Sequence, residues 1–172
     1  MEPLNNLYDL FTKQLKDRFD SEQQQFEAFP NMMKRASSIE LKRTIKLSIE
    51  GSRLHMQKLE QVMNKLHIDP VSELCEGSIS MINETWALME RTTTPEVTDA
   101  ALIVAIQHIH HYDIAGYGSL SAFARALDLD EIAHTLHDML AEEKNLDALL
   151  KEMALKSINR KASALPQEQA TA

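Results

Sequence analysis

The sequence predicts an all-helical protein, built as a four-helix bundle with one additional shorter helix. Leu, Ala, Met, Glu, Lys and Gln are abundant, and the 172 residues include only 4 glycines and 5 prolines, a composition that favours helices. Hydrophobic residues recur at helical spacing, as in "DAALIVAIQHIHHYDIAGYGSLSAFARAL". No segment alternates with the period of two that an exposed strand shows. A chain of this length can bury a substantial core as one domain.

The first two long helices are predicted from prolines and helix caps. Pro3 is expected to open the first helix, which runs as far as Pro30 and stops or kinks there, with "NMMKRA" as a short continuation. Ser37 and Glu40 have the spacing of a capping box for the second helix. We expect that helix to end near His67.

Each of the remaining three helices is predicted from a polar cap followed by Pro or, three residues later, by Glu. They span about residues 70–91 after Asp69, about 95–127 after Thr94 and Pro95, and about 129–159 after Asp128 with Glu131. The third helix is the shortest and can act as a long crossover between the second and the fourth. Such a crossover is the topology of ferritin-like folds. The predicted domain covers residues 1–160, and the small polar tail 161–172 is expected to be disordered.

Composition excludes several classes of protein. The chain has 18 Lys and Arg against 26 Asp and Glu, a net charge of -8, so a nucleic-acid partner is not expected because phosphate binding needs a concentrated positive surface. The longest apolar run, "AALIVAI", is too short to cross a membrane. No secretory signal is evident at the N-terminus. Cys75 is the only cysteine, which fits a reducing cytoplasm and a buried thiol better than a nucleophile.

Every long helix carries a potential metal ligand on or beside its hydrophobic face. On a helical wheel of roughly 100° per residue, these side chains fall among the buried positions, around the middle of their helices. They are Glu22 in the first helix, His55 in the second, His110 and Asp113 in the fourth, and Glu143 and Asp147 in the fifth. Antiparallel packing would bring them to one level of the bundle.

Carboxylates at such positions need positive partners, because burying an unpaired charge is costly. Arg18, near the edge of the first hydrophobic face, is one candidate. Two divalent metal ions are another, since four carboxylates and two neutral imidazoles would balance their charge. These ligands suit iron or manganese, and zinc is compatible; dimetal sites in bundles are built in this way. In the alternative interpretation, the polar groups satisfy one another without metal.

The chain also resembles a known family. The segments "QHIHHYDIAGYGSL" and "LAEEKNLDALL" are specific matches to the YciE/YciF-type ferritin-like family of bacterial stress proteins, and "DSEQQQFEAFPNMMKRASSIELK" and "SIEGSRLHMQKLEQV" are weaker ones. Together they cover about residues 4–162. The resemblance implies a cytoplasmic, homodimeric, ferritin-like protein that is associated with stress and has a dimetal site.

The same resemblance implies that the site is altered. Glu22, Glu143 and Asp147 match the family pattern, whereas His110 and the shorter Asp113 replace family glutamates, and Gly51 stands where the second helix usually has Glu. A site for one metal ion, or for none, is therefore expected. Two functions follow as hypotheses: a metal-binding protein that sequesters or oxidises iron, or a metal-free helical stress or interaction protein with a degenerate site. The sequence assigns no reaction or substrate.

Overall fold

The computed structural model describes residues 3–70 and 74–163, and within them it confirms the all-helical class, with no strand. The helices are α1 (Leu7–Arg35), α2 (Ile39–Lys65), α3 (Glu76–Glu90), α4 (Pro95–Ala126) and α5 (Asp130–Met153), followed by a π-helical turn (Ala154–Ile158) and α6 (Asn159–Ala162). None of the described helices is long and apolar enough to span a membrane.

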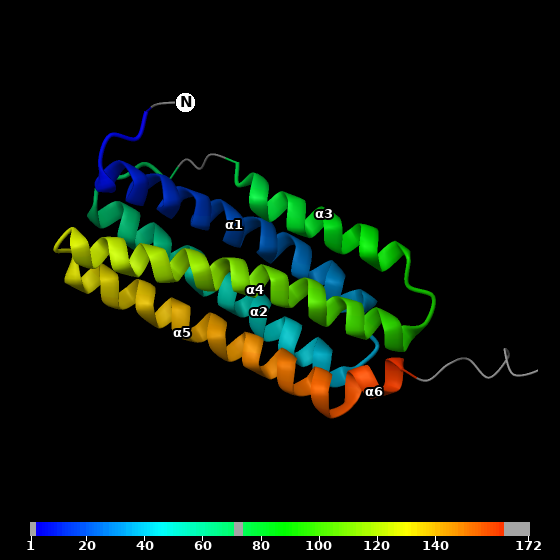
Figure 1. Cartoon of the computed structure of the whole chain (residues 1–172). Helices are drawn as coiled ribbons and strands as arrows, with labels where there is room; N and C mark the ends of the chain where they lie inside the picture. The colour runs from blue at the N-terminus through cyan, green and yellow to red at the C-terminus, as the bar shows by residue number, and fades with distance from the viewer. Residues whose placement is uncertain (1–2, 71–73, 164–172) are drawn as a thin grey trace, which may run out of the picture.

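The connection through α3 gives the bundle its topology. α1 and α2 are antiparallel neighbours, as are α4 and α5, whereas α3 lies along the outside of α1 and α4 and returns the chain to the end where α2 began (Figure 1). As a result, α4 runs parallel to α2. Ser48 contacts His110, and seven residues further along both helices His55 contacts Tyr117. This is the predicted ferritin-like arrangement with a crossover helix.

The predicted start of α1 was wrong, whereas the predicted continuation beyond Pro30 is confirmed. The helix begins at Leu7, because the Asn6 side chain accepts a hydrogen bond from the backbone N–H of Asp9 and so caps it. It continues through Pro30 to Arg35. Proline removes one helical hydrogen bond, but Phe29, just before it, and Met32, two residues after it, are fully buried, and this packing holds the helix together.

The predicted caps of α2 and α3 were wrong by different amounts. Ser38, one residue after the predicted Ser37, caps α2, and the Asp99 carboxylate on α4 binds both serines across the bundle. Pro70 does not start α3, which begins only after Cys75, whose backbone N–H donates to Asp20 on α1 at 2.7 Å. Partners distant in sequence thus fix both starts. The predicted cap of α4, Thr94 followed by Pro95, is confirmed.

Two left-handed residues end α2 and α4. His67 has φ 55° and Asp128 has φ 58°, and in each case the next residue donates its N–H back to a carbonyl five residues earlier, Ile68 to Met63 and Leu129 to Ala124, both at 2.9 Å. This is the Schellman motif. It explains why Asp128 does not cap α5 as predicted: its backbone already closes α4, and Leu129 stands at the cap position.

The helical path continues beyond α5 at the end of the bundle. It changes to a π-helical turn at Ala154 and continues as α6 to Ala162. The rest of the tail predicted to be disordered, residues 164–172, lies outside the described residues.

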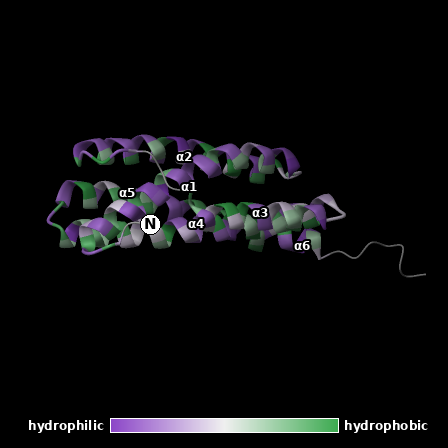
Figure 2. Cartoon of the chain, turned by 90° about the horizontal axis from the view of Figure 1, so that it is seen from above, coloured by the Kyte–Doolittle hydropathy of each residue, from purple (hydrophilic) through white to green (hydrophobic). Residues whose placement is uncertain are grey.

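The core consists of two hydrophobic clusters with a polar layer between them. One cluster is built around Phe29, Ile45 and Ile106, and the other around Leu15, Leu59 and Leu136. Every helix carries both hydrophobic and hydrophilic segments, as Figure 2 shows. Because apolar clusters close the polar layer from both ends, charges within it interact more strongly than they would in water.

Candidate metal centre

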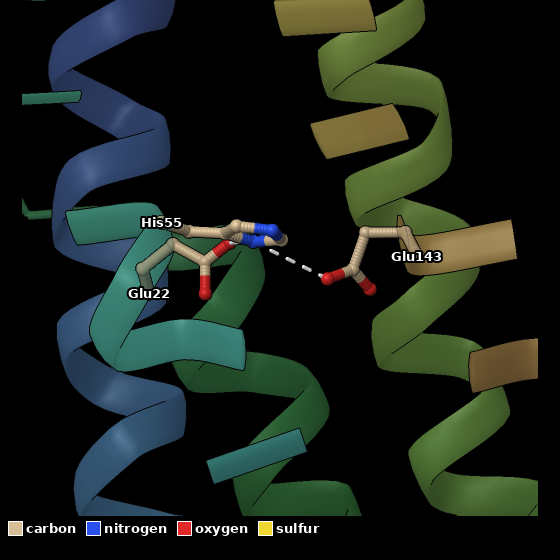
Figure 3. Close-up of side chains that lie close together, drawn as sticks. All are labelled: Glu22, His55 and Glu143. Atoms are coloured by element: carbon tan, nitrogen blue, oxygen red, sulfur yellow. Dashed lines mark hydrogen bonds and ion pairs between the residues drawn. The ribbon is translucent and has the colours of Figure 1, made fainter. Parts of the chain in front are cut away.

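Three of the predicted ligands meet in the polar layer from three different helices. Glu22 on α1, His55 on α2 and Glu143 on α5 point toward one another (Figure 3), and they offer ligand atoms within 4.8 Å of one another. His55 Nδ1 lies 2.9 Å from Glu22 Oε1 and 3.4 Å from Glu143 Oε1. Glu22 and His55 are fully buried, and Glu143 is 3% exposed.

His55 connects this interior group to the surface. Its second ring nitrogen, Nε2, lies 2.8 Å from Glu142 Oε2, and Glu142 is half exposed and also pairs with Lys58 at 2.8 Å. Burial lowers the pKa of His55, but hydrogen bonds to Glu22 and Glu142 and the negative charge of Glu143 outweigh that effect and raise the pKa to about 9. Without metal, His55 is therefore an imidazolium at neutral pH.

Glu22 holds a free ligand atom in the interior. Its Oε1 accepts hydrogen bonds from His55 and, at 2.5 Å, from the Tyr117 hydroxyl, whereas its buried Oε2 has no hydrogen-bond partner among the described residues. Burial raises the pKa of Glu22, yet the hydrogen bond and charge of His55, followed by the bond from Tyr117, bring it below its usual value. Burial and the nearby Glu22 carboxylate raise the pKa of Tyr117, so this hydroxyl stays a donor.

A second group of three ligands shares Glu143. His110 and Asp113 on α4 offer atoms that also lie within 4.8 Å of one another and of Glu143. His110 Nδ1 lies 2.5 Å from Glu143 Oε2, and its Nε2 lies 3.1 Å from the Ser48 hydroxyl. Both ring nitrogens of His110 thus have partners on neighbouring helices, and Glu143 links the two groups.

Asp113 differs from the other ligands because it already has a permanent cation. One of its oxygens accepts from the Arg18 guanidinium and the other from Gln25 Nε2 at 2.8 Å. Burial raises the pKa of Asp113 well above its usual range, and the Arg18 charge acts against that rise. The predicted role of Arg18 as a counterion is therefore realised at one carboxylate.

Asp147, the sixth predicted ligand, does not join the centre. It is half-buried at the seam between α4 and α5, where its Oδ1 accepts from Gln107 Nε2 at 2.8 Å and lies 3.3 Å from His111 Nε2. Asp147 lies four residues after Glu143, which rotates it by ~40° about the helix axis and moves it ~6 Å along that axis. This displacement places the Asp147 carboxylate in the adjacent layer of the bundle.

Four further residues complete the network around the predicted ligands. Gln25 and Tyr117 stand three and four residues after a predicted ligand on the same helix, so helical spacing carried a signal for both. The Tyr117 hydroxyl donates its hydrogen bond to Glu22. Ser48 lies on the hydrophobic face of α2 two turns before His55. Glu142 carried no signal, because it adjoins Glu143 in sequence and faces elsewhere.

The donor set fits one divalent metal ion better than two. In the group of Glu22, His55 and Glu143, one carboxylate oxygen has no hydrogen-bond partner within residues 3–70 and 74–163, and this chemistry of two carboxylates and one imidazole suits iron, manganese or zinc. In the second group, Asp113 has both oxygens engaged by Arg18 and Gln25. A second ion there would have to displace a buried guanidinium.

The fold and its polar layer define a ferritin-like helical bundle with buried carboxylate and histidine groups. Residues 6–163 match the family described as "Domain of unknown function (DUF892)", and the chain belongs to that family. It is 29% identical over 160 residues to Protein YciF of Escherichia coli (strain K12), an alignment that covers 92% of this chain and 96% of YciF.

Two solved structures are closely similar. The crystal structure of the E. coli stress protein YciF superposes with a TM-score of 0.87 at 28% identity, covering 91% of this chain and 99% of that one. The Rhodopseudomonas palustris protein YcfI superposes with a TM-score of 0.85 at 30% identity, covering 87% and 96%. The resemblance to the YciF-type family is thereby confirmed.

Proposed function

We propose that this protein is a stress-associated metal-binding protein that holds one divalent ion, iron or manganese, through Glu22, His55 and Glu143. The observation that carries the proposal is the meeting of these three ligands from three helices, together with the buried Oε2 of Glu22, which has no hydrogen-bond partner in the described part of the chain. Leaving a carboxylate oxygen unsatisfied in an apolar core is unfavourable. A cation beside it would remove that penalty.

The residues of the centre would then have separate roles. Glu22 and Glu143 supply negative charge, and the Tyr117 hydroxyl holds Glu22 in place through its 2.5 Å hydrogen bond. To act as a ligand, His55 has to lose the proton on Nδ1, the nitrogen that faces Glu22 and Glu143. Glu142 would then accept a hydrogen bond from the remaining N–H at Nε2 and hold the ring in place. A bound iron ion would supply oxidation or peroxide chemistry, so that iron sequestration or iron oxidation under stress is the proposed activity.

A metal-free role is the second candidate, and one observation favours it. His55 as an imidazolium and Arg18 as a guanidinium already place two positive charges among the buried carboxylates. In that case the polar layer would serve to fix the register of the bundle, and the protein would act through its surface. The two candidate functions differ in whether the purified protein retains a metal ion.

Elemental analysis of protein purified without chelator separates them, followed by titration with Fe²⁺ monitored by absorbance. The metal-binding proposal expects close to one equivalent of iron, manganese or zinc per chain and a saturable response. Glu143→Ala should abolish both, because Glu143 belongs to both ligand groups. Retention of less than a tenth of an equivalent, with no response to Fe²⁺, would leave the metal-free role.

The metal-free role makes its own prediction for the same variant. Glu143→Ala would reduce the free energy of unfolding, because it leaves the buried Nδ1 of His110 without its hydrogen-bond partner. The family resemblance further supports a cytoplasmic homodimer, and light scattering of the purified protein would measure that assembly. A mass of one chain in solution would contradict the dimer without affecting the metal proposal.

A further inference from the structure

Arg18 is a charged side chain in an unusual position. It is only 2% exposed, and its guanidinium forms an ion pair with Asp113 in the second ligand group. The Cζ atom lies 4.1 Å from the centre of the Tyr112 ring, a cation–π contact, and Nη2 lies 4.0 Å from the Cys75 sulfur. A single guanidinium is thus surrounded by groups that favour a positive charge.

The neighbouring helix makes room for this side chain at a glycine. A Cβ atom at Gly116 on α4 would lie 2.8 Å from Cδ and 2.9 Å from Nε of Arg18, closer than carbon atoms approach in proteins. Glycine in a helix interior is unfavourable relative to alanine by about 1 kcal/mol. Its presence one turn after Asp113 therefore provides the space through which Arg18 reaches the centre.

The charges at the centre balance with one metal ion and this arginine. Glu22, Asp113 and Glu143 are the buried carboxylates of the two ligand groups, and they carry three negative charges when Asp113 is ionised in its pair with Arg18. One divalent ion with Arg18 provides three positive charges when the imidazoles are neutral. Two divalent ions with Arg18 would leave two positive charges in excess, which is unfavourable between apolar clusters.

From these contacts we propose that the Arg18 guanidinium takes the place of a second metal ion, so that it sets the metal content of the centre. The group of His110, Asp113 and Glu143 becomes a second metal site when the arginine charge is removed. The inference rests on the proposed function for the first ion, but it concerns the difference between two variants and can be tested separately.

The experiment measures how many Mn²⁺ ions the metal-depleted full-length protein binds. Mn²⁺ prefers carboxylate ligands and interacts weakly with surface histidines. Free Mn²⁺ has a six-line electron paramagnetic resonance signal, so the bound number follows from titration. We expect one ion for the unchanged protein and two for Arg18→Met. We also expect Mn²⁺ to raise the melting temperature of Arg18→Met more than that of the unchanged protein, because the ion replaces a lost cation.

The outcomes keep the two claims apart. An increase from one ion to two supports both, and an increase from none to one supports the role of Arg18 while it overturns binding at the first group. An unchanged number in Arg18→Met overturns the role of Arg18, whatever the number is. If Arg18→Met does not fold, Arg18→Gln, which loses the charge but keeps an N–H donor, is measured in its place by the same criterion.

Three matched variants show whether the added ion sits where the inference places it. Arg18→Lys keeps the positive charge and should bind no more Mn²⁺ than the unchanged protein. Arg53→Met removes an exposed arginine that pairs with Glu50 on α2, and it should also leave the number unchanged. Adding Glu143→Gln to Arg18→Met should remove both ions, since both groups use that carboxylate. An extra ion that persists there would lie elsewhere and would refute the inference.

Discussion

The two sides of the polar layer contain the same kinds of ligand but differ in how their charge is compensated. On one side, Glu22 and Glu143 meet His55, whose positive charge is a proton that the imidazole can lose. On the other side, Asp113 is paired with Arg18, whose charge cannot leave because the guanidinium remains protonated in proteins. One side can exchange its cation, and the other has its cation built into the chain.

This difference explains how a single layer can combine binding and stability. The side around His55 keeps a carboxylate oxygen that no described residue hydrogen-bonds, and a proton that a metal ion can displace. The side around Arg18 has both Asp113 oxygens hydrogen-bonded, so it is complete without any ligand. Four predictions test that contrast, beginning with the change expected to have the largest effect.

Arg18→Met should reduce the free energy of unfolding of the metal-free protein by about 3–5 kcal/mol, because it leaves Asp113 buried without its cation. Urea unfolding in the presence of chelator measures this. The control is the double variant with Asp113→Asn, which removes both charges and should recover most of the loss. If the double variant is no more stable than Arg18→Met, the loss comes from packing and not from the unpaired carboxylate.

On the side around His55, the free energy of unfolding is expected to depend on pH. The pKa of His55 in the folded protein is about 9, above the ordinary value of ~6.5. The stabilisation from its proton is therefore complete below pH ~6.5 and is lost as pH rises to about 9, at most about 3 kcal/mol for the metal-free protein. Urea unfolding at several pH values tests this, and His55→Gln should flatten the dependence in that range.

A bound metal ion should reverse that dependence. Because a metal ion and a proton compete for His55, the affinity for Mn²⁺ should increase with pH over the same interval. Stability of the metal-free protein that stays constant from pH 6 to 9 would mean that folding does not shift the pKa of His55, so that its proton does not stabilise this side.

Gly116→Ala should have a smaller effect, a loss of about 1–3 kcal/mol from overpacking, although alanine favours the helix more than glycine does. The added Cβ would meet Arg18, so that side chain has to shift. Gly118→Ala is the matched control on the same helix, since its Cβ would make only an ordinary contact, 3.9 Å from Leu140. Equal stability of the two variants would show that Arg18 does not depend on the glycine.

Local sequence signals predicted the fold correctly, but they did not predict every helix boundary. The cap of Thr94 and Pro95 identifies the start of α4 because its hydrogen bond is local. The starts of α2 and α3 depend on Asp99 and Asp20, which are distant in sequence. Asp128 carried a cap signal for α5, but its left-handed backbone ends α4.

The centre shows the same division between local periodicity and packing. Helical spacing brought five of the six predicted ligands to one layer, because α1, α2, α4 and α5 each place one level of their hydrophobic face there. Spacing could not show that Arg18 would reach Asp113 on another helix, nor that Glu142 would contact His55 from the surface. Those contacts depend on long side chains that cross between helices.

Asp147 provides the last and smallest prediction, since it is the one predicted ligand that lies in the neighbouring layer. Asp147→Asn should leave the Mn²⁺ content unchanged and alter the free energy of unfolding by less than about 1 kcal/mol, because asparagine can still accept the hydrogen bond from Gln107. The same titration that counts ions in Arg18→Met measures it. A loss of metal in Asp147→Asn would mean that α5 contributes a second carboxylate to the centre, and the contrast between its two sides would have to be redrawn around that ligand.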